Sequence, residues 1–241
     1  MSTKKRGISG WAAAAVVGLL LFHGWLVFVK THDAFEIDAR PNTVPSPNIM
    51  GDLEIGQTFV APSDGLSRID VKMATHRRSN DREVVFRLWE IRPERHLVRE
   101  TVFNPADTLD NLYRTFAFDP ISQSGGKTYA FTLISPGSTL GNSLSVWMNE
   151  ADIYPGGRAI LNGQPLTGDL TFRTYSRKTP AQAWSRILAR SSGLPGAAAA
   201  VLLAAAFVLF EAVQIAFILA LVGSLRTRRI RSGFHPEAAH A

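Results

Sequence analysis

Residues 195–225 have the sequence PGAAAAVLLAAAFVLFEAVQIAFILALVGSL, an apolar run with one acid, Glu211, near its middle. The hydrocarbon core of a bilayer is about 30 Å thick, and about 20 apolar residues of α-helix cross it. The run is long enough to cross even when the helix is tilted. Four arginines follow it, and basic residues favour the cytoplasmic end of a span. The pattern therefore predicts a transmembrane helix over residues 195–225 and a cytoplasmic basic tail over residues 226–241.

A second apolar run, residues 8–29, lies near the other end of the chain and contains no Asp, Glu, Lys or Arg. It follows a short basic segment, residues 1–7, which is predicted to be cytoplasmic. The run has 22 residues and no small-residue cleavage site after it, whereas the apolar region of a secretory signal peptide has about 7–15 residues. We expect an uncleaved transmembrane helix here, with a cleaved signal peptide as the alternative.

The charge distribution indicates the compartment. The formal net charge is +6, but residues 30–193 hold 19 Lys and Arg against 18 Asp and Glu, so the excess lies beside the apolar runs. A nucleic-acid binder carries its basic residues on a folded face instead, so nucleic acid is not expected as a partner. The chain has no cysteine and no Asn-x-Ser/Thr acceptor, which is ordinary for a bacterial periplasmic domain. Both termini are expected in the cytoplasm of a bacterial cell, with the middle segment in the periplasm and two spans in the inner membrane.

The middle segment has the period of β-strands. Residues 30–50 contain three prolines and are predicted to be a linker. Over residues 51–178, short runs alternate between apolar and polar residues, as half-buried strands do, and turn residues separate them. In one run, Ile69, Val71 and Met73 share a face. We expect an all-β, jelly-roll-like sandwich flanked by one transmembrane helix on each side.

The sandwich resembles jelly-roll domains of the carbohydrate-binding-module type over residues 53–176. The motifs that carry the resemblance are Gln57-Thr-Phe59, Ile69-Asp-Val71, Gly126-Lys-Thr-Tyr129 and Asp169-Leu-Thr-Phe172. The resemblance implies a domain that binds glycan or contacts another protein. Some such domains hold a structural calcium, for which the candidate oxygen ligands are Asp107, Asp110 and Asn111. The alternative is that these three residues are solvated loop residues, and no cofactor is expected.

Residues 180–192 return to a helical period. Trp184, Ile187 and Leu188 fall on one side, and Arg186 and Arg190 fall on another. An amphipathic helix of this kind lies along a membrane surface. The alternative is the last ordered turn of a linker.

Three aromatic residues are predicted to point away from the core of the sandwich. Trp89, Tyr113 and Trp147 alternate against the apolar positions of their runs. Exposed aromatic rings stack on sugar rings or anchor a protein partner. These residues are candidates for a ligand or partner platform, unless a loop covers them.

The sequence offers little support for catalysis. Ser124-Gly-Gly-Lys-Thr128 has part of the phosphate-loop pattern, but Ile121 stands where that pattern requires glycine and a predicted strand follows. His76 and His96 lack the paired spacing of metal ligands, and no two carboxylates are placed as an acid and a base. We expect that the chain is not an enzyme, with a periplasmic hydrolase as the weaker alternative.

Glu211 is the most distinctive residue of the second apolar run. A charge at the bilayer centre costs at least about 2.5–3.5 kcal/mol, so the carboxyl group should be protonated, paired or turned towards protein. Gln214 lies on the same helical face, and small residues four apart, which let helices pack closely in lipid, form two ladders nearby. The ladders are Gly196, Ala200 and Ala204, and Ala212, Ala216 and Ala220.

We expect these residues to pack against helices of another subunit. The first apolar run of the same chain, which offers only His23, is another candidate, and a neutral Glu211 bonded within its own helix is the alternative. The sequence thus predicts a non-catalytic accessory subunit in a transport, polymer-synthesis, respiratory or photosynthetic membrane assembly. A membrane-tethered glycan-binding protein in envelope polysaccharide handling is the alternative prediction.

Overall fold

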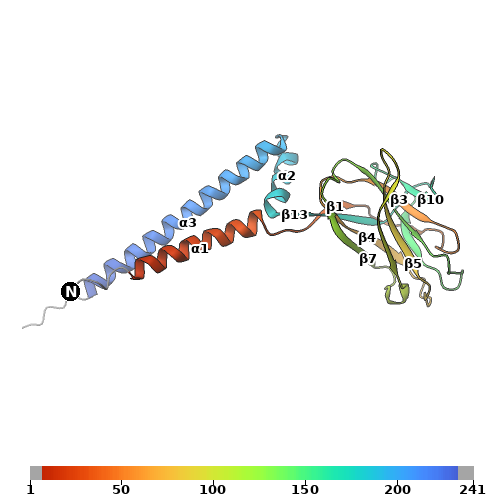
Figure 1. Cartoon of the computed structure of the whole chain (residues 1–241), viewed down its shortest axis with the longest axis horizontal. Coiled ribbons are helices and arrows are strands. Elements are labelled where there is room, and N and C mark those ends of the chain that lie inside the picture. Colours follow the sequence, from red (N-terminus) through yellow and green to blue (C-terminus); the bar gives the residue numbers. More distant parts are fainter. Residues whose placement is uncertain (1–6, 233–241) are drawn as a thin grey trace, which may run out of the picture. The chain divides into compact units, whose positions relative to one another are not determined.

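The chain is described by a computed structural model over residues 7–232, with side-chain surroundings for residues 13–224 (Figure 1). Its contacts divide it into two compact units, His32–Lys178 and the helical residues on either side. The predicted cytoplasmic segments, residues 1–7 and 226–241, lie outside the residues whose side chains are described.

The unit His32–Lys178 is built from two antiparallel sheets, as the sequence predicts for a β-sandwich. One sheet has the path β1–β13–β4–β9–β12, with β7 paired to β4 and β2 paired to β9; the other has the path β11–β10–β3–β8–β5–β6. The strands of the first sheet are β1 (His32–Asp38), β2 (Val44–Pro45), β4 (Leu66–Ala74), β7 (Tyr113–Ile121), β9 (Ser145–Asn149), β12 (Asp169–Leu170) and β13 (Phe172–Lys178). Those of the second are β3 (Ile55–Val60), β5 (Val84–Glu90), β6 (His96–Phe103), β8 (Thr128–Ile134), β10 (Ala159–Leu161) and β11 (Gln164–Pro165), and a 3₁₀ turn, η1 (Pro105–Asp107), precedes β7.

The core consists of the inward faces of the alternating strands. Ile69, Val71 and Met73 of β4 are fully buried, as their period of two predicts. Aromatic rings fill the centre, and the rings of Phe86 and Phe116 stack at a centroid distance of 3.9 Å. Burial of large aromatic side chains dominates the stability of such a core.

The prediction of a linker over residues 30–50 is wrong. This segment contains β1 and β2, and Ala39 and Ile49 are buried within it. Strand β1 pairs along its length with β13, which lies at the other end of the domain sequence. The prolines are compatible with this arrangement because β2 is a two-residue strand that pairs only with β9.

The register fixes the two ends of the sandwich. His32 stands opposite Lys178, so both connections to the helical residues leave the domain from one end. Ala74 stands opposite Ser145 at the other end. Loops 75–83, 104–112 and 135–144 gather there, where the Arg78 Nη1 donates to the carbonyl of Leu140 at 2.8 Å.

The other unit consists of α1 (Gly7–Phe28), α2 (Pro180–Ser192) and α3 (Gly196–Ser232) in the described chain. Helix α2 occupies the residues for which the sequence predicts a helix. It begins at a capping box in which Thr179 and Gln182 each satisfy the backbone N–H of the other. It ends at Gly193, whose φ of 69° suits glycine.

Among the described residues, one helical segment is long and apolar enough to cross a membrane, Gly196–Ser224 in α3. Only 6% of its most apolar window is buried, which is unlike the core helix of a soluble protein. The apolar part of α1 with described side chains, Ala13–Phe28, spans about 24 Å at the helical rise of 1.5 Å per residue. It is shorter than a bilayer core, so the prediction of an N-terminal transmembrane helix over residues 8–29 is not confirmed, and among the described residues only the second predicted span meets the length requirement.

Candidate functional site

Helices α1 and α3 meet through a polar pair. His23 Nδ1 lies 2.9 Å from Glu211 Oε1. The rings of Phe28 and Phe207 meet edge to face at 5.1 Å. Because later residues of α1 contact earlier residues of α3, the helices are antiparallel, and Figure 1 shows them side by side.

Glu211 lies inside the helix pair. Its side chain is 8% exposed and that of His23 is 27% exposed, although most of α3 is exposed. Its second oxygen, Oε2, is buried and has no hydrogen-bond partner in the described chain. Gln214, on the same face, is half-buried. Of the candidate partners that the sequence leaves open for Glu211, the structure brings His23 of the same chain to it.

The second small-residue ladder lies on a different face of α3 from Glu211. Ala212, Ala216 and Ala220 are exposed, and Ala212 is turned by about 100° from Glu211 around the helix. In the first ladder, Gly196 and Ala200 are exposed and Ala204 is half-buried. The structure therefore separates an internal polar pair from an outward small-residue face.

The three outward aromatic residues do not form one platform. Trp89 lies on β5, whereas Tyr113 and Trp147 lie on β7 and β9 of the other sheet. Each is half-buried, and a cation covers its ring: Arg95 at 4.3 Å for Trp89, Arg173 at 4.1 Å for Tyr113 and Lys72 at 5.9 Å for Trp147. The outward direction agrees with the alternation, but stacking of a sugar would require these cations to move.

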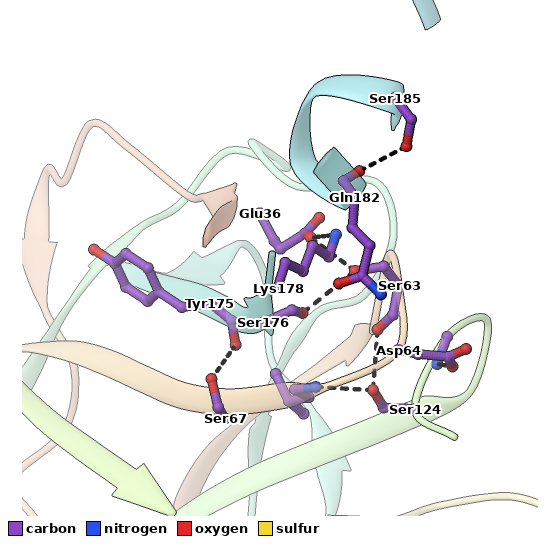
Figure 2. A network of polar contacts seen from close by, with 12 residues as sticks. Glu36, Ser63, Asp64, Ser67, Ser124, Tyr175, Ser176, Lys178, Gln182 and Ser185 are labelled. Atoms are coloured by element: carbon purple, nitrogen blue, oxygen red, sulfur yellow. Dashed lines mark hydrogen bonds and ion pairs between the residues drawn. The ribbon is translucent and has the colours of Figure 1, made fainter. Parts of the chain in front are cut away.

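A polar network ties the first and last strands to neighbouring loops, as Figure 2 shows. Lys178 pairs with Glu36, and Ser63 Oγ donates to Glu36 Oε1 at 2.7 Å. Ser124 Oγ donates to the carbonyl of Ser63 at 3.0 Å and accepts from the N–H of Leu66 at 3.0 Å. The phosphate-loop-like stretch around Ser124 is thus a turn between β7 and β8, and its hydroxyl is used to hold that turn.

A serine, a histidine and an acid gather among the loops of the far end, which the sequence analysis did not predict. His76 Nε2 lies 3.0 Å from Ser145 Oγ, and Asp110 Oδ1 accepts from the N–H of Thr75 at 2.8 Å. They come from three separate segments of the chain, so no spacing in the sequence links them.

The geometry of this cluster differs from that of a nucleophile and its base. Ser145 Oγ donates to Asn48 Oδ1 at 3.3 Å, and that oxygen also accepts from Arg78. A hydroxyl has one proton, so when Ser145 donates it to Asn48, Ser145 Oγ acts only as an acceptor towards His76 Nε2. The acid contacts the backbone beside the histidine, whereas a catalytic acid orients the ring.

The stability contribution of His76 should depend on pH. Partial loss of hydration, helped by the charge of Arg78, lowers the pKa of the exposed His76 below its ordinary value of 6.5. The unfolded chain then binds the proton more tightly than the folded chain, so this contribution is present above about pH 6.5 and is lost as pH falls through the folded pKa. An NMR titration should place the His76 pKa below 6.5. A pKa at or above that value would contradict the expectation, and His76→Asn, which suits the φ of 55°, should remove this part of the pH dependence of the melting temperature.

The predicted calcium ligands have other partners. Asp110 Oδ1 and Oδ2 accept from Thr75 N–H and from Asn111 Nδ2, and Asn111 Oδ1 accepts from the indole of Trp147 at 2.7 Å. Asp107 ends η1. Across the described residues, no three His, Cys, Asp or Glu side chains gather as metal ligands. These contacts hold loop 104–112 against β4 and β9.

Known protein families and curated proteins offer no match to this chain. The functional proposal therefore depends on the fold and on the geometry of these sites.

Proposed function

We propose that the chain is a non-catalytic, membrane-anchored accessory subunit that docks to a larger membrane-protein assembly. The single observation that carries the proposal is the organisation of α3. Its one acid faces inward to His23, while apolar and small residues face outward. The outward face of such a helix can contact lipid or another apolar helix, because small residues four apart allow close approach of two backbones.

In this proposal α1 enters the membrane beside α3. The buried pair of His23 and Glu211 removes two polar groups from lipid, where unpaired polar groups are costly. The arginines that follow the apolar part of α3 favour the cytoplasm for that end of the helix. The sandwich then lies in the periplasm of a bacterial inner-membrane protein, with α2 along the membrane surface.

The proposed docking surface is the outward ladder of Ala212, Ala216 and Ala220, and the partner is a helix of a transport, polymer-synthesis, respiratory or photosynthetic assembly. The proposal of a glycan-binding protein with a carbohydrate-binding-module-like jelly roll ranks second. It depends on Trp89, Tyr113 and Trp147, whose rings are covered by cations on two different sheets. A hydrolase ranks third, because the Ser145 and His76 pair has the wrong proton arrangement for attack.

Replacing Ala212 and Ala216 with leucine should lower recovery of the partner about tenfold, because bulky side chains separate the helices and cost about 1–2 kcal/mol. The measurement is quantitative mass spectrometry of what co-purifies with the full-length chain from native membranes in mild detergent. The matched control is Phe210→Leu, a change at an exposed position on another face of α3. Equal recovery with both variants would remove the ladder from the proposal, and a wild-type chain that purifies without any partner would overturn the proposal itself.

A further inference from the structure

A pocket lies beside β7 at the end of the sandwich away from the chain connections. Its volume is about 300 Å³, roughly ten times the volume that one water molecule occupies in the liquid. Its lining residues come from η1, the following loop and the start of β7, and they are Asp107, Thr108, Leu109, Leu112, Tyr113, Arg114 and Thr115. The predicted platform residue Tyr113 is one of them, but the sequence analysis did not single out Arg114.

Arg114 is the unusual group of this pocket. Its guanidinium stacks on Phe103, with Cζ 3.9 Å from the ring centroid, and Nη1 donates to Thr108 Oγ1 at 2.9 Å. No carboxylate lies within salt-bridge distance of it in the described part of the chain. Arg68 and Arg173, by contrast, pair with Asp70 and Asp38. A half-buried guanidinium with one hydroxyl acceptor has several N–H groups left for a bound anion.

The pKa shifts of Arg68 and Arg114 agree with the presence of a paired carboxylate beside Arg68 and its absence beside Arg114. The hydrogen bond that Arg68 donates to Asp70 is the largest cause that raises the pKa of Arg68. Burial lowers the pKa of Arg114, and Asp107 only partly opposes it. The protein therefore keeps a cation in a place where its own residues do not compensate the loss of hydration.

The walls of the pocket are held in place without a ligand. The N–H of Asn111 donates to the carbonyl of Met73 at 3.0 Å, and the N–H of Met73 donates to the carbonyl of Leu112 at 3.0 Å. Asp110 and the side chain of Asn111 add the bonds to Thr75 and Trp147 described above. A site formed in advance loses less entropy on binding.

The remaining lining residues define the chemistry around Arg114. Leu109 and Leu112 are 66% and 53% exposed, so they offer apolar surface that a ligand could cover. Asp107 is exposed and, as an acceptor, it suits a hydroxyl or ammonium donor and disfavours a second negative charge. Thr108 and Thr115 also line the pocket, and their hydroxyl groups are bonded to Arg114 and to Asp70.

We propose that this pocket binds a small monocarboxylate that carries a hydroxyl or ammonium group beside the carboxylate and a short aliphatic chain. The carboxylate accepts hydrogen bonds from the guanidinium of Arg114. The adjacent hydroxyl or ammonium group donates to Asp107, and the aliphatic chain covers Leu109 and Leu112. The site is independent of the proposed helix docking and gives the sandwich a ligand of its own.

The test is calorimetric titration of the full-length chain in lipid nanodiscs with 2-hydroxy-4-methylpentanoate, with empty nanodiscs as the blank. We expect saturable binding at millimolar or lower concentration. The corresponding diol, which lacks the carboxylate, should bind at least about tenfold more weakly, because the bond to the guanidinium is lost. Arg114→Gln should cause a loss of the same size.

The matched control is Arg99→Gln, which removes another half-buried arginine, one that lies near Phe118 and donates to backbone carbonyls. Binding should be unchanged in this variant. Leu112→Glu, at an exposed position, tests the pocket without changing the arginine and should also abolish binding. Absence of binding by the wild-type chain at millimolar ligand overturns the proposal, as does binding that survives both Arg114→Gln and Leu112→Glu. If Arg114→Gln fails to fold, the comparison of the acid with its diol and the Leu112→Glu variant still decide the outcome.

Discussion

Replacing Gly157 with alanine should destabilise the sandwich by more than about 4 kcal/mol, a loss reached only by severe core defects. A Cβ atom at this position would lie 1.8 Å from the carbonyl oxygen of Thr58 and 2.5 Å from its carbonyl carbon. Both atoms are backbone of β3, so no side chain can rotate to make room. Strand β3 is held on both sides by β8 and β10, and a shift of β3 would break two ladders of hydrogen bonds.

The measurement is thermal unfolding of the full-length chain in mild detergent, followed by near-ultraviolet circular dichroism of the sandwich. Gly141→Ala is the matched control, since no atom lies within 4 Å of its added Cβ. It should change the free energy of unfolding by no more than about 0.5 kcal/mol. Similar melting curves for the two variants would mean that the segment from Tyr154 to Arg158 does not cross β3 as closely as described.

Replacing Asp169 with alanine should cost about 3–5 kcal/mol, because each buried donor that loses its acceptor costs about 1–3 kcal/mol. Its side chain accepts three hydrogen bonds, from Gln57 Nε2 at 2.8 Å and from the N–H groups of Ile153 and Tyr154 at 2.9 Å each. The residue is 1% exposed, so alanine would leave buried donors without an acceptor and without access to water. Because Gln57 is on β3 and Asp169 is on β12, the loss would also loosen the link between the two sheets.

The same melting experiment checks this prediction, with Asp119→Ala as the control at an exposed acid. Asp169→Asn should be intermediate, because the amide keeps one acceptor oxygen and turns two donors towards other donors. A loss below about 1 kcal/mol for Asp169→Ala would show that water replaces the carboxylate, contrary to its burial.

The parts of the fold that follow a local rule could be predicted from the sequence. Alternation around Val71 and Phe86 gives strands with one buried face, and the apolar run around Glu211 gives a long helix. Strand β1 could not be predicted, because the residues that stabilise it belong to β13. Asp33 pairs with Arg177, which lies 144 positions away. The local hydrophobic periodicity of the sequence does not indicate such a distant partner.

The candidate sites show the same division. The sequence marks Glu211 as a polar residue in need of a partner, but only the structure places His23 beside it. It gives the outward direction of Trp89 and Trp147, but not the sheets on which they lie or the cations over their rings. Arg114 has no signal in the sequence, because its distinguishing property is the absence of a nearby carboxylate, which depends on loops folded around it.

The pairing of β1 with β13 has a consequence for the order in which the domain forms during synthesis. The first sheet lacks the partner of β1 until Lys178 has been made, so this pairing is completed only after the rest of the domain has been synthesised. Such distant pairings form late because their loops are costly to close. Helix α3 begins shortly afterwards, at Gly196, an interval of about 1–4 s at ordinary rates of translation. The last strand of the first sheet and the start of the apolar helix are therefore synthesised within a few seconds of each other.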